Sequence, residues 1–267
     1  MTTLKKYLML DTSSDALTIA LAQKNPEDEA LVLLEEQTQI LSNQHGVTLL
    51  PTIQQVIANH QWKANDITDI WVGRGPGSYT GLRIGLTLAK MWAQVHPVTV
   101  KTMSSLALMA AQTPREDVQS WIVPVMDARR MTAYTNIYCW NHQGRLQAVL
   151  KDQHIAWDSW CQTLIQQAQA ANISHIYFVG KDIDNFVQAF KEKSVNIGSE
   201  WLDDQGNYPK AASSVYIDDL LLVSDIHTLT PNYAHVTLAE QEWAQKNDQI
   251  IANEDDHERF IEHFSGH

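Results

Sequence analysis

The most informative segment of the chain reads GRGPGSYTGLRIG and runs from Gly73 to Gly85. It follows an apolar run at residues 69–72, which predicts a buried strand, and it leads into a helix expected over about 80–95. A glycine-rich loop between a strand and a helix N-terminus can cradle a phosphate, because the backbone can approach a ligand closely there. The segment has neither a Walker A ending nor a GxGxxG pattern, so it does not establish nucleotide binding by itself.

A stripe of small residues marks one face of this predicted helix. It recurs at every fourth position and consists of Gly81, Gly85, Ala89 and Ala93, with Leu82, Leu86 and Trp92 beside it. Residues four apart lie on the same helix face, and small side chains let another helix approach closely. We expect this face to be a protein–protein interface. The alternative is that the helix packs tightly onto its own sheet.

Upstream, a cluster of turn-forming residues separates two predicted strands, at about 7–10 and 17–22. It reads Asp11-Thr12-Ser13-Ser14, and its hydroxyls and amides could hold a phosphate. The alternative is that Asp, Thr and Ser are simply the residues that tight turns contain. The candidate phosphate-binding set predicted from both loops consists of Asp11, Thr12, Ser13, Gly75, Gly77 and Arg83.

The second half of the chain repeats the mixture of strands and single helices. We expect strands at 121–126, 132–140 and 176–179, and helices at 158–171, 184–193 and 237–245. Together with a helix predicted at 44–60, this order favours an α/β fold with a partly antiparallel sheet. Asp127-Ala128-Arg129, at a predicted strand end, could bind a polar ligand, or its two charges could neutralise each other.

No metal site is predicted. His45 lies at the start of a predicted helix, but Leu49 occupies the position four residues later, where a second histidine ligand would stand. The sequence contains no HExxH motif, and it shows no catalytic triad or carboxylate pair. A zinc protease therefore has almost no support from the residues.

The composition indicates a soluble, acidic protein with room for two lobes. The 267 residues have a formal net charge of -12, which disfavours a broad surface for RNA or anionic membranes. Cys139 and Cys161 are too few for a disulfide framework. No stretch approaches the roughly 20 apolar residues of a membrane span, so a cytoplasmic protein is expected.

Several blocks, taken in order, resemble the TsaB (YeaZ) family. They are the segment 10–14, His45 followed by Leu50-Pro51, the segment 73–85, the segment 127–129 and Pro231-Asn232-Tyr233. The resemblance implies an α/β fold of the ASKHA class, which is actin-like and ribonuclease-H-like, with two related lobes that have mixed sheets flanked by helices. The first lobe would comprise 1–102 and about 231–247, the second 103–230, and an acidic tail 248–267.

The resemblance also implies a function. The chain would be a non-catalytic dimerisation subunit that pairs with the catalytic subunit TsaD and the ATPase TsaE, in a complex that forms threonylcarbamoyladenosine at position 37 of tRNA. The family pairs through the helices that correspond to 44–60 and 80–95, which adds Leu50, Ile53 and Ile57 to the expected interface. Alone, the chain would form homodimers. No intrinsic cofactor is implied, but ATP or ADP could bind at the interface of the complex.

Two departures from the family pattern bear on these expectations. Where the catalytic subunits of the superfamily carry an HxxxH metal motif, this chain has His45 and Leu49. After Asp127-Ala128-Arg129 the family usually has a glycine and an acid, whereas Met131 and Thr132 stand near that point here.

Two other functions remain as alternatives to the dimerisation subunit. They are a nucleotide-binding ASKHA enzyme and a glycoprotease-like hydrolase.

Overall fold

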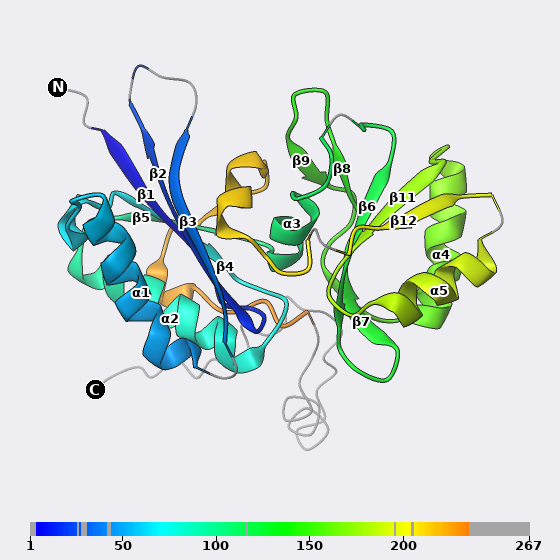
Figure 1. Ribbon diagram of the computed structural model, residues 1–267, viewed down its shortest axis with the longest axis horizontal. Helices are drawn as coiled ribbons and strands as arrows, with labels where there is room; N and C mark the ends of the chain where they lie inside the picture. The colour runs from blue at the N-terminus through cyan, green and yellow to red at the C-terminus, as the bar shows by residue number, and fades with distance from the viewer. Residues whose placement is uncertain are drawn as a thin grey trace.

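Two mixed β-sheets lie side by side, each with its own pair of helices (Figure 1). The computed structural model describes residues 4–25, 27, 31–41, 44–115, 117–194, 196–203 and 206–234. Among these residues, no helix has both the length and the hydropathy that crossing a membrane requires.

The first sheet is built around a hairpin and two parallel strands. Its strands are β1 (Lys5–Asp11), β2 (Ala16–Lys24), β3 (Val32–Ile40), β4 (Asp69–Gly73), β5 (Thr99–Met103) and β13 (Leu221–Leu222). They lie in the order β13-β5-β4-β1-β2-β3, with β4 and β5 parallel to β1 and with β2 antiparallel to both of its neighbours. The helices α1 (His45–Asn59) and α2 (Tyr79–Val95) bury their apolar faces against this sheet and form one core with it.

The second sheet repeats this connectivity. Its main strands are β6 (Trp121–Asp127), β7 (Thr132–Thr135), β10 (Gln153–Ala156), β11 (His175–Val179) and β12 (Gly198–Trp201), in the order β10-β7-β6-β11-β12. Again an antiparallel hairpin is followed by two parallel strands. The sheet also has β8 (Tyr138–Trp140) and β9 (Leu146–Ala148), and the helices are α4 (Trp157–Ala170) and α5 (Asp184–Lys193). The predicted α/β fold with two related lobes is therefore confirmed.

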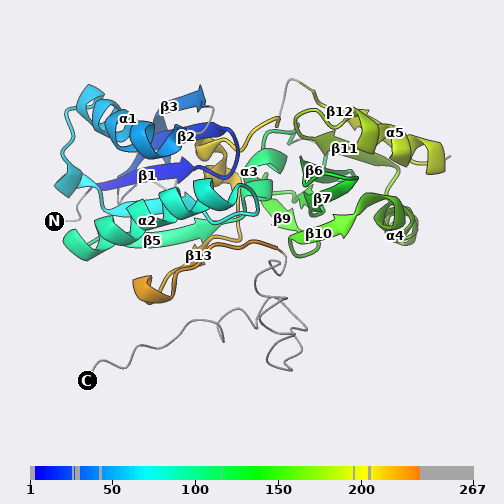
Figure 2. The same ribbon diagram turned by 90° about the horizontal axis from the view of Figure 1, so that it is seen from below.

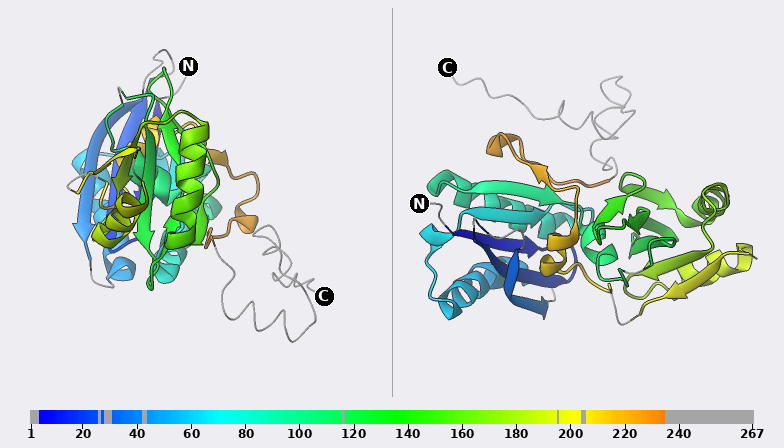
Figure 3. Two further views of the ribbon diagram at one scale, coloured as in Figure 1. Left: turned by 90° about the vertical axis from the view of Figure 1, so that its right-hand side faces the viewer. Right: turned by 90° about the horizontal axis from the view of Figure 1, so that it is seen from above.

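Between the sheets lie α3 (Ser105–Ala110) and the 3₁₀ helix η2 (Ala211–Tyr216) (Figure 3). Every residue of α3 is buried. One hydrophobic cluster runs from Met9 of the first sheet through α3 to Ile122 and Trp140 of the second. The two lobes thus share a continuous apolar core.

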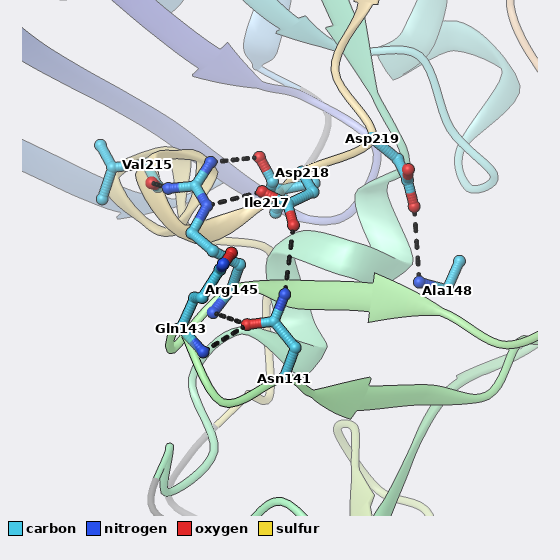
Figure 4. A network of polar contacts seen from close by, with 8 residues as sticks. All are labelled: Asn141, Gln143, Arg145, Ala148, Val215, Ile217, Asp218 and Asp219. Carbon is cyan, nitrogen blue, oxygen red and sulfur yellow. Dashed lines mark hydrogen bonds and ion pairs between the residues drawn. The ribbon is translucent and has the colours of Figure 1, made fainter.

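A network of hydrogen bonds and an ion pair around Arg145 fixes the chain where it leaves the second lobe. The guanidinium of Arg145 donates to the carbonyls of Val215 and Ile217 and forms an ion pair with Asp218 at 2.7 Å (Figure 4). Asn141 from the same hairpin also donates to Asp218. Such forked, charge-assisted contacts hold η2 and the residues after it against the β8–β9 hairpin.

Two expectations about boundaries differ from the structure. The chain returns to the first sheet before residue 231, because β13 pairs with β5 from Leu221 onward (Figure 2). The single strand predicted at 132–140 is two strands, interrupted where the Asn136 side chain accepts the backbone N–H of Ile137. The predicted helix at 237–245 and the acidic tail at 248–267 lie outside the described residues. The remaining short elements are the 3₁₀ helices η1 (Ala64–Asp66) and η3 (Ile226–Thr228).

Candidate functional site

The glycine-rich loop packs directly onto the turn between β1 and β2. Because β1 and β4 are parallel neighbours, Asp11 and Gly73 lie side by side, and a Cβ atom at Gly73 would stand 1.9 Å from Oδ2 of Asp11. A Cβ atom at Gly77 would stand 2.2 Å from the carbonyl oxygen of Ser13, which accepts the backbone N–H of Ser78 at 2.6 Å. The glycines at these points allow two loops to touch.

The buried carboxylate of Asp11 accepts three hydrogen bonds from within the chain. It accepts the backbone N–H of Ser13 at 2.8 Å, the Ser13 hydroxyl at 2.6 Å and the Ser105 hydroxyl at 2.6 Å. Burial raises the pKa of Asp11, and these hydrogen bonds offset only part of that effect. Asp11 therefore joins β1 to α3.

The other predicted phosphate-binding residues are also used within the chain. Thr12 donates its hydroxyl to the Gly81 carbonyl at 2.8 Å, and Gly75 packs against the backbone of Asn232. Arg83 is exposed and lies on α2, away from the turn. The structure thus brings Asp11, Thr12, Ser13, Gly75 and Gly77 together as an internal joint, and the geometry does not leave them open to a phosphate.

Asp11→Asn is expected to change how stability depends on pH. A raised pKa in the folded state means that the fold disfavours the charged carboxylate, so this contribution to stability is present below the unfolded pKa of about 4 and is lost as pH rises through the folded pKa. The free energy of unfolding of the wild type minus that of Asp11→Asn should therefore fall as pH rises from about 4. Urea unfolding at several pH values measures this difference, with Asp203→Asn as an exposed control. A difference that stays flat or rises with pH would contradict the assignment.

The small-residue stripe packs against the chain's own first lobe, and the interface predicted around it stays a prediction. A Cβ atom at Gly81 would stand 2.0 Å from the Thr12 carbonyl oxygen, and one at Gly85 would stand 2.4 Å from the Thr12 hydroxyl. The stripe therefore lets α2 sit closely on the end of β1, which is the alternative that the sequence left open. Most of the other expected interface residues are buried in the core of the first lobe or packed against it: Ile53, Ile57, Leu82, Leu86, Ala89, Trp92 and Ala93.

An apolar groove of about 550 Å³ lies instead between the outer faces of α1 and α2. Of the residues predicted for the interface, Leu50 lines it and is 47% exposed. Met91, which is 61% exposed, stands on the opposite wall. The groove is lined by Gly46, Leu49, Leu50, Tyr79, Thr80, Arg83, Ile84, Thr87, Leu88 and Met91.

Sequence reasoning missed the α2 side of this groove. Ile84, Leu88 and Met91 follow one another at helical spacing, which is a second apolar face of the same helix. In the structure Ile84 and Leu88 pack only partly against the core of the first lobe, and Met91 is exposed. The helical spacing of these three residues was visible in the sequence, next to the more obvious stripe of small residues.

A cluster of aromatic rings and one arginine lies at the N-terminal end of α2. The rings of Tyr79 and Tyr233 stack with their centroids 4.9 Å apart. Arg83 lies 4.1 Å from the centroid of the Tyr79 ring and donates to the Tyr233 hydroxyl at 3.1 Å. Tyr79 and Arg83 both line the groove, and tyrosine and arginine are residue types that often dominate protein interfaces.

The segment Asp127-Ala128-Arg129 forms the tight turn between β6 and β7. Asp127 accepts the backbone N–H of Arg129 at 2.7 Å, and Arg129, Arg130 and Met131 all have positive φ angles. The side-chain hydrogen bond and the positive φ angles indicate that the segment serves to reverse the chain. Among the described residues, no group of three or more His, Cys, Asp or Glu side chains is arranged to hold a metal ion.

Comparison with known proteins identifies the family to which the chain belongs. The chain matches the family model described as TsaD, tRNA N6-adenosine threonylcarbamoyltransferase, over residues 35–252. It is 29% identical over 238 residues to the tRNA threonylcarbamoyladenosine biosynthesis protein TsaB of Bacillus subtilis, a match that covers 89% of this chain and 97% of that protein. It is 26% identical over 153 residues to the Escherichia coli protein of the same name, covering 55% of this chain and 63% of that protein.

Solved structures show the same fold. The match to YeaZ from Pseudomonas aeruginosa has a TM-score of 0.64 at 19% identity and covers 86% of this chain and 99% of that one. A second Pseudomonas aeruginosa structure, described as an uncharacterized protein with similarity to peptidase YEAZ, has a TM-score of 0.67 at 19% identity and covers 86% and 100%. The family model covers more than half of the chain, and the TsaB protein of Bacillus subtilis matches it over nearly the whole length of both proteins. The chain therefore belongs to the family described by the threonylcarbamoyltransferase model and, within it, to the TsaB (YeaZ) proteins of tRNA threonylcarbamoyladenosine biosynthesis.

Proposed function

We propose that this chain is the non-catalytic partner subunit of a tRNA N6-adenosine threonylcarbamoyltransferase complex, and that it binds a TsaD-type catalytic subunit through the groove between α1 and α2. The observation that carries this proposal is the groove itself. Its walls present Leu50 and Met91 to solvent, and Tyr79 and Arg83 stand at one end. An exposed apolar groove with aromatic and arginine residues is typical of a protein-binding surface.

Two features of the molecule support a scaffold rather than a nucleotide-using enzyme. The glycine-rich loop is filled by the β1–β2 turn, and Asp11 is bonded to Ser13 and Ser105. The two lobes share a core through α3, which opposes the opening and closing that enzymes use to enclose a substrate. In this proposal the chain acts on the reaction by holding the catalytic subunit in an active arrangement.

The rest of the assembly follows from the same proposal. A TsaE-type ATPase joins the pair, tRNA is bound through the complex, and ATP or ADP can occupy the junction of the two subunits. The complex works in the cytoplasm. Without its partner, the chain covers its apolar groove by forming a homodimer.

Size-exclusion chromatography with light scattering tests the pairing. The chain alone should elute as a homodimer, and addition of the TsaD-type subunit of the same organism should convert it to a heterodimer. Threonylcarbamoyl transfer to tRNA should require both subunits. A chain that does not associate with that subunit, or that alone catalyses the transfer, would refute the proposal.

A further inference from the structure

The apolar groove between α1 and α2 contains one charged side chain. Arg83 is the only charged residue among the described residues that line the groove, and its side chain is exposed. Neither helix contains an aspartate or a glutamate, although the whole chain has 31 acidic residues against 19 lysines and arginines. A strongly acidic protein thus presents a groove whose lining has no acidic side chain.

Two tyrosines hold the Arg83 guanidinium in place. Its Cζ atom lies 4.1 Å from the centroid of the Tyr79 ring, and its Nε atom donates to the Tyr233 hydroxyl at 3.1 Å. Among the residues that the structure describes, none accepts a hydrogen bond from the two terminal nitrogens of this side chain. The guanidinium is therefore restrained in its orientation, while its terminal nitrogens keep their donors for another molecule.

A partner that covers the groove must offer an acceptor to Arg83. Covering the apolar walls also removes water from the guanidinium, and a charge that loses its water without gaining a hydrogen-bonded partner opposes binding. The two terminal nitrogens match the two oxygens of a carboxylate, which can accept both hydrogen bonds at once. A partner with an aspartate or glutamate at this point replaces the lost water, whereas a purely apolar or basic partner does not.

A second copy of this chain offers no such acceptor from its own groove. In a symmetric dimer the same patch of surface meets itself, so α1 and α2 of one copy face α1 and α2 of the other. Because neither helix has an acidic residue, both Arg83 side chains would be covered without an opposite charge. An unpaired covered charge is a feature that disfavours one partner relative to another.

We propose that Arg83 selects the catalytic subunit over a second copy of this chain, by pairing with a carboxylate of that subunit. This inference rests on the proposed function, because both dimers are taken to form through the groove. It adds the chemistry of the partner surface, which is apolar with an aspartate or glutamate where it meets Arg83. The homodimer still covers the groove of the free chain, but it is the weaker of the two dimers.

Arg83→Met is expected to move the two dimers in opposite directions. Methionine keeps a long apolar side chain but removes the charge, so the heterodimer with the TsaD-type subunit should weaken about 30-fold or more. The homodimer should strengthen about tenfold, because two uncompensated charges are removed from its interface. Isothermal titration calorimetry measures the heterodimer, and sedimentation velocity of a dilution series measures the homodimer.

Arg115→Met is the matched control. Arg115 is also exposed and lies 4.0 Å from the centroid of the Tyr216 ring, but it does not line the groove. This change should leave both affinities as in the wild type. Arg83→Gln, which also lacks the charge, should act in the same directions as Arg83→Met and serves if the methionine variant does not fold.

The salt dependence of binding tests the carboxylate. The affinity of the wild-type heterodimer should fall more steeply with added NaCl than that of Arg83→Met, because salt screens an ion pair. Equal salt dependence in the two proteins would mean that Arg83 meets no opposite charge and would overturn the proposal.

Leu50→Ala separates a failure of this inference from a failure of the proposed function. It shortens an apolar side chain of the groove without adding a charge, so it should weaken both dimers. If it does so while Arg83→Met leaves both affinities unchanged or moves them in one direction, the selection by Arg83 is refuted and the pairing surface stands. If Leu50→Ala changes neither dimer, the groove is not the pairing surface, and the role of Arg83 is refuted with it.

Discussion

Leu50→Glu is expected to weaken binding to the TsaD-type catalytic subunit about 100-fold or more, while the chain itself remains folded. Leu50 is 47% exposed on α1 and lines the apolar groove. In the proposed complex its side chain is covered, so a glutamate there would lose its water without gaining a charged partner. In the monomer the same glutamate is solvated and favours the helix, so Leu50→Glu should weaken the expected homodimer as well as the heterodimer.

Isothermal titration calorimetry of the variant against the catalytic subunit measures this effect. Val149→Glu is the matched control, because Val149 is 41% exposed but lies in the second lobe, away from α1 and α2. Circular dichroism during thermal unfolding shows whether either variant is destabilised. If Leu50→Glu binds with wild-type affinity, the groove is not the pairing surface.

Gly81→Ala is expected to lower the free energy of unfolding by about 3 kcal/mol, because the new methyl group overpacks the core. It would stand 2.0 Å from the carbonyl oxygen of Thr12, a backbone atom that the β1–β2 turn holds in place. Helix propensity alone predicts the opposite sign, since alanine stabilises a helix relative to glycine by about 1 kcal/mol. The sign of the change therefore decides between close packing and an open helix face.

Gly46→Ala provides the matched control within the same lobe. Gly46 lies in α1, and the nearest atom to a Cβ atom there is Cδ1 of Ile84, at 3.8 Å, an ordinary contact. This change should leave stability unchanged or raise it by about 0.5 kcal/mol. Urea unfolding of the two variants measures both values. A Gly81→Ala variant as stable as wild type would mean that α2 does not sit on the turn as described.

Much of the fold could be predicted from local pattern. The helices α1, α2 and α5 and the strands β1, β4 and β11 follow runs with clear periodicity, so their boundaries were predicted closely. The shortest strands could not be predicted this way. β13 consists of two exposed leucines and forms because β5 offers it an edge. β12, Gly198–Trp201, has only one apolar side chain besides its glycine and forms by pairing with β11.

For the candidate site, prediction from the sequence failed for a different reason. Spacing showed that α2 has a face of small residues, but it could not show what that face touches. Gly81 and Gly85 turned out to meet Thr12, which is about seventy residues earlier in the chain and reaches α2 only because β1 and β4 are neighbours. The surface that we propose for a partner therefore lies on another face of α2, along Ile84, Leu88 and Met91.

The apolar core that α3 shares with both sheets has a consequence for assembly. Since α3 is buried between the lobes, they cannot swing independently without exposing it to water. A protein that grips the first lobe thereby also fixes the direction in which the second lobe projects. In the proposed complex, a contact with the first lobe would therefore also set the orientation of the surfaces on the second lobe.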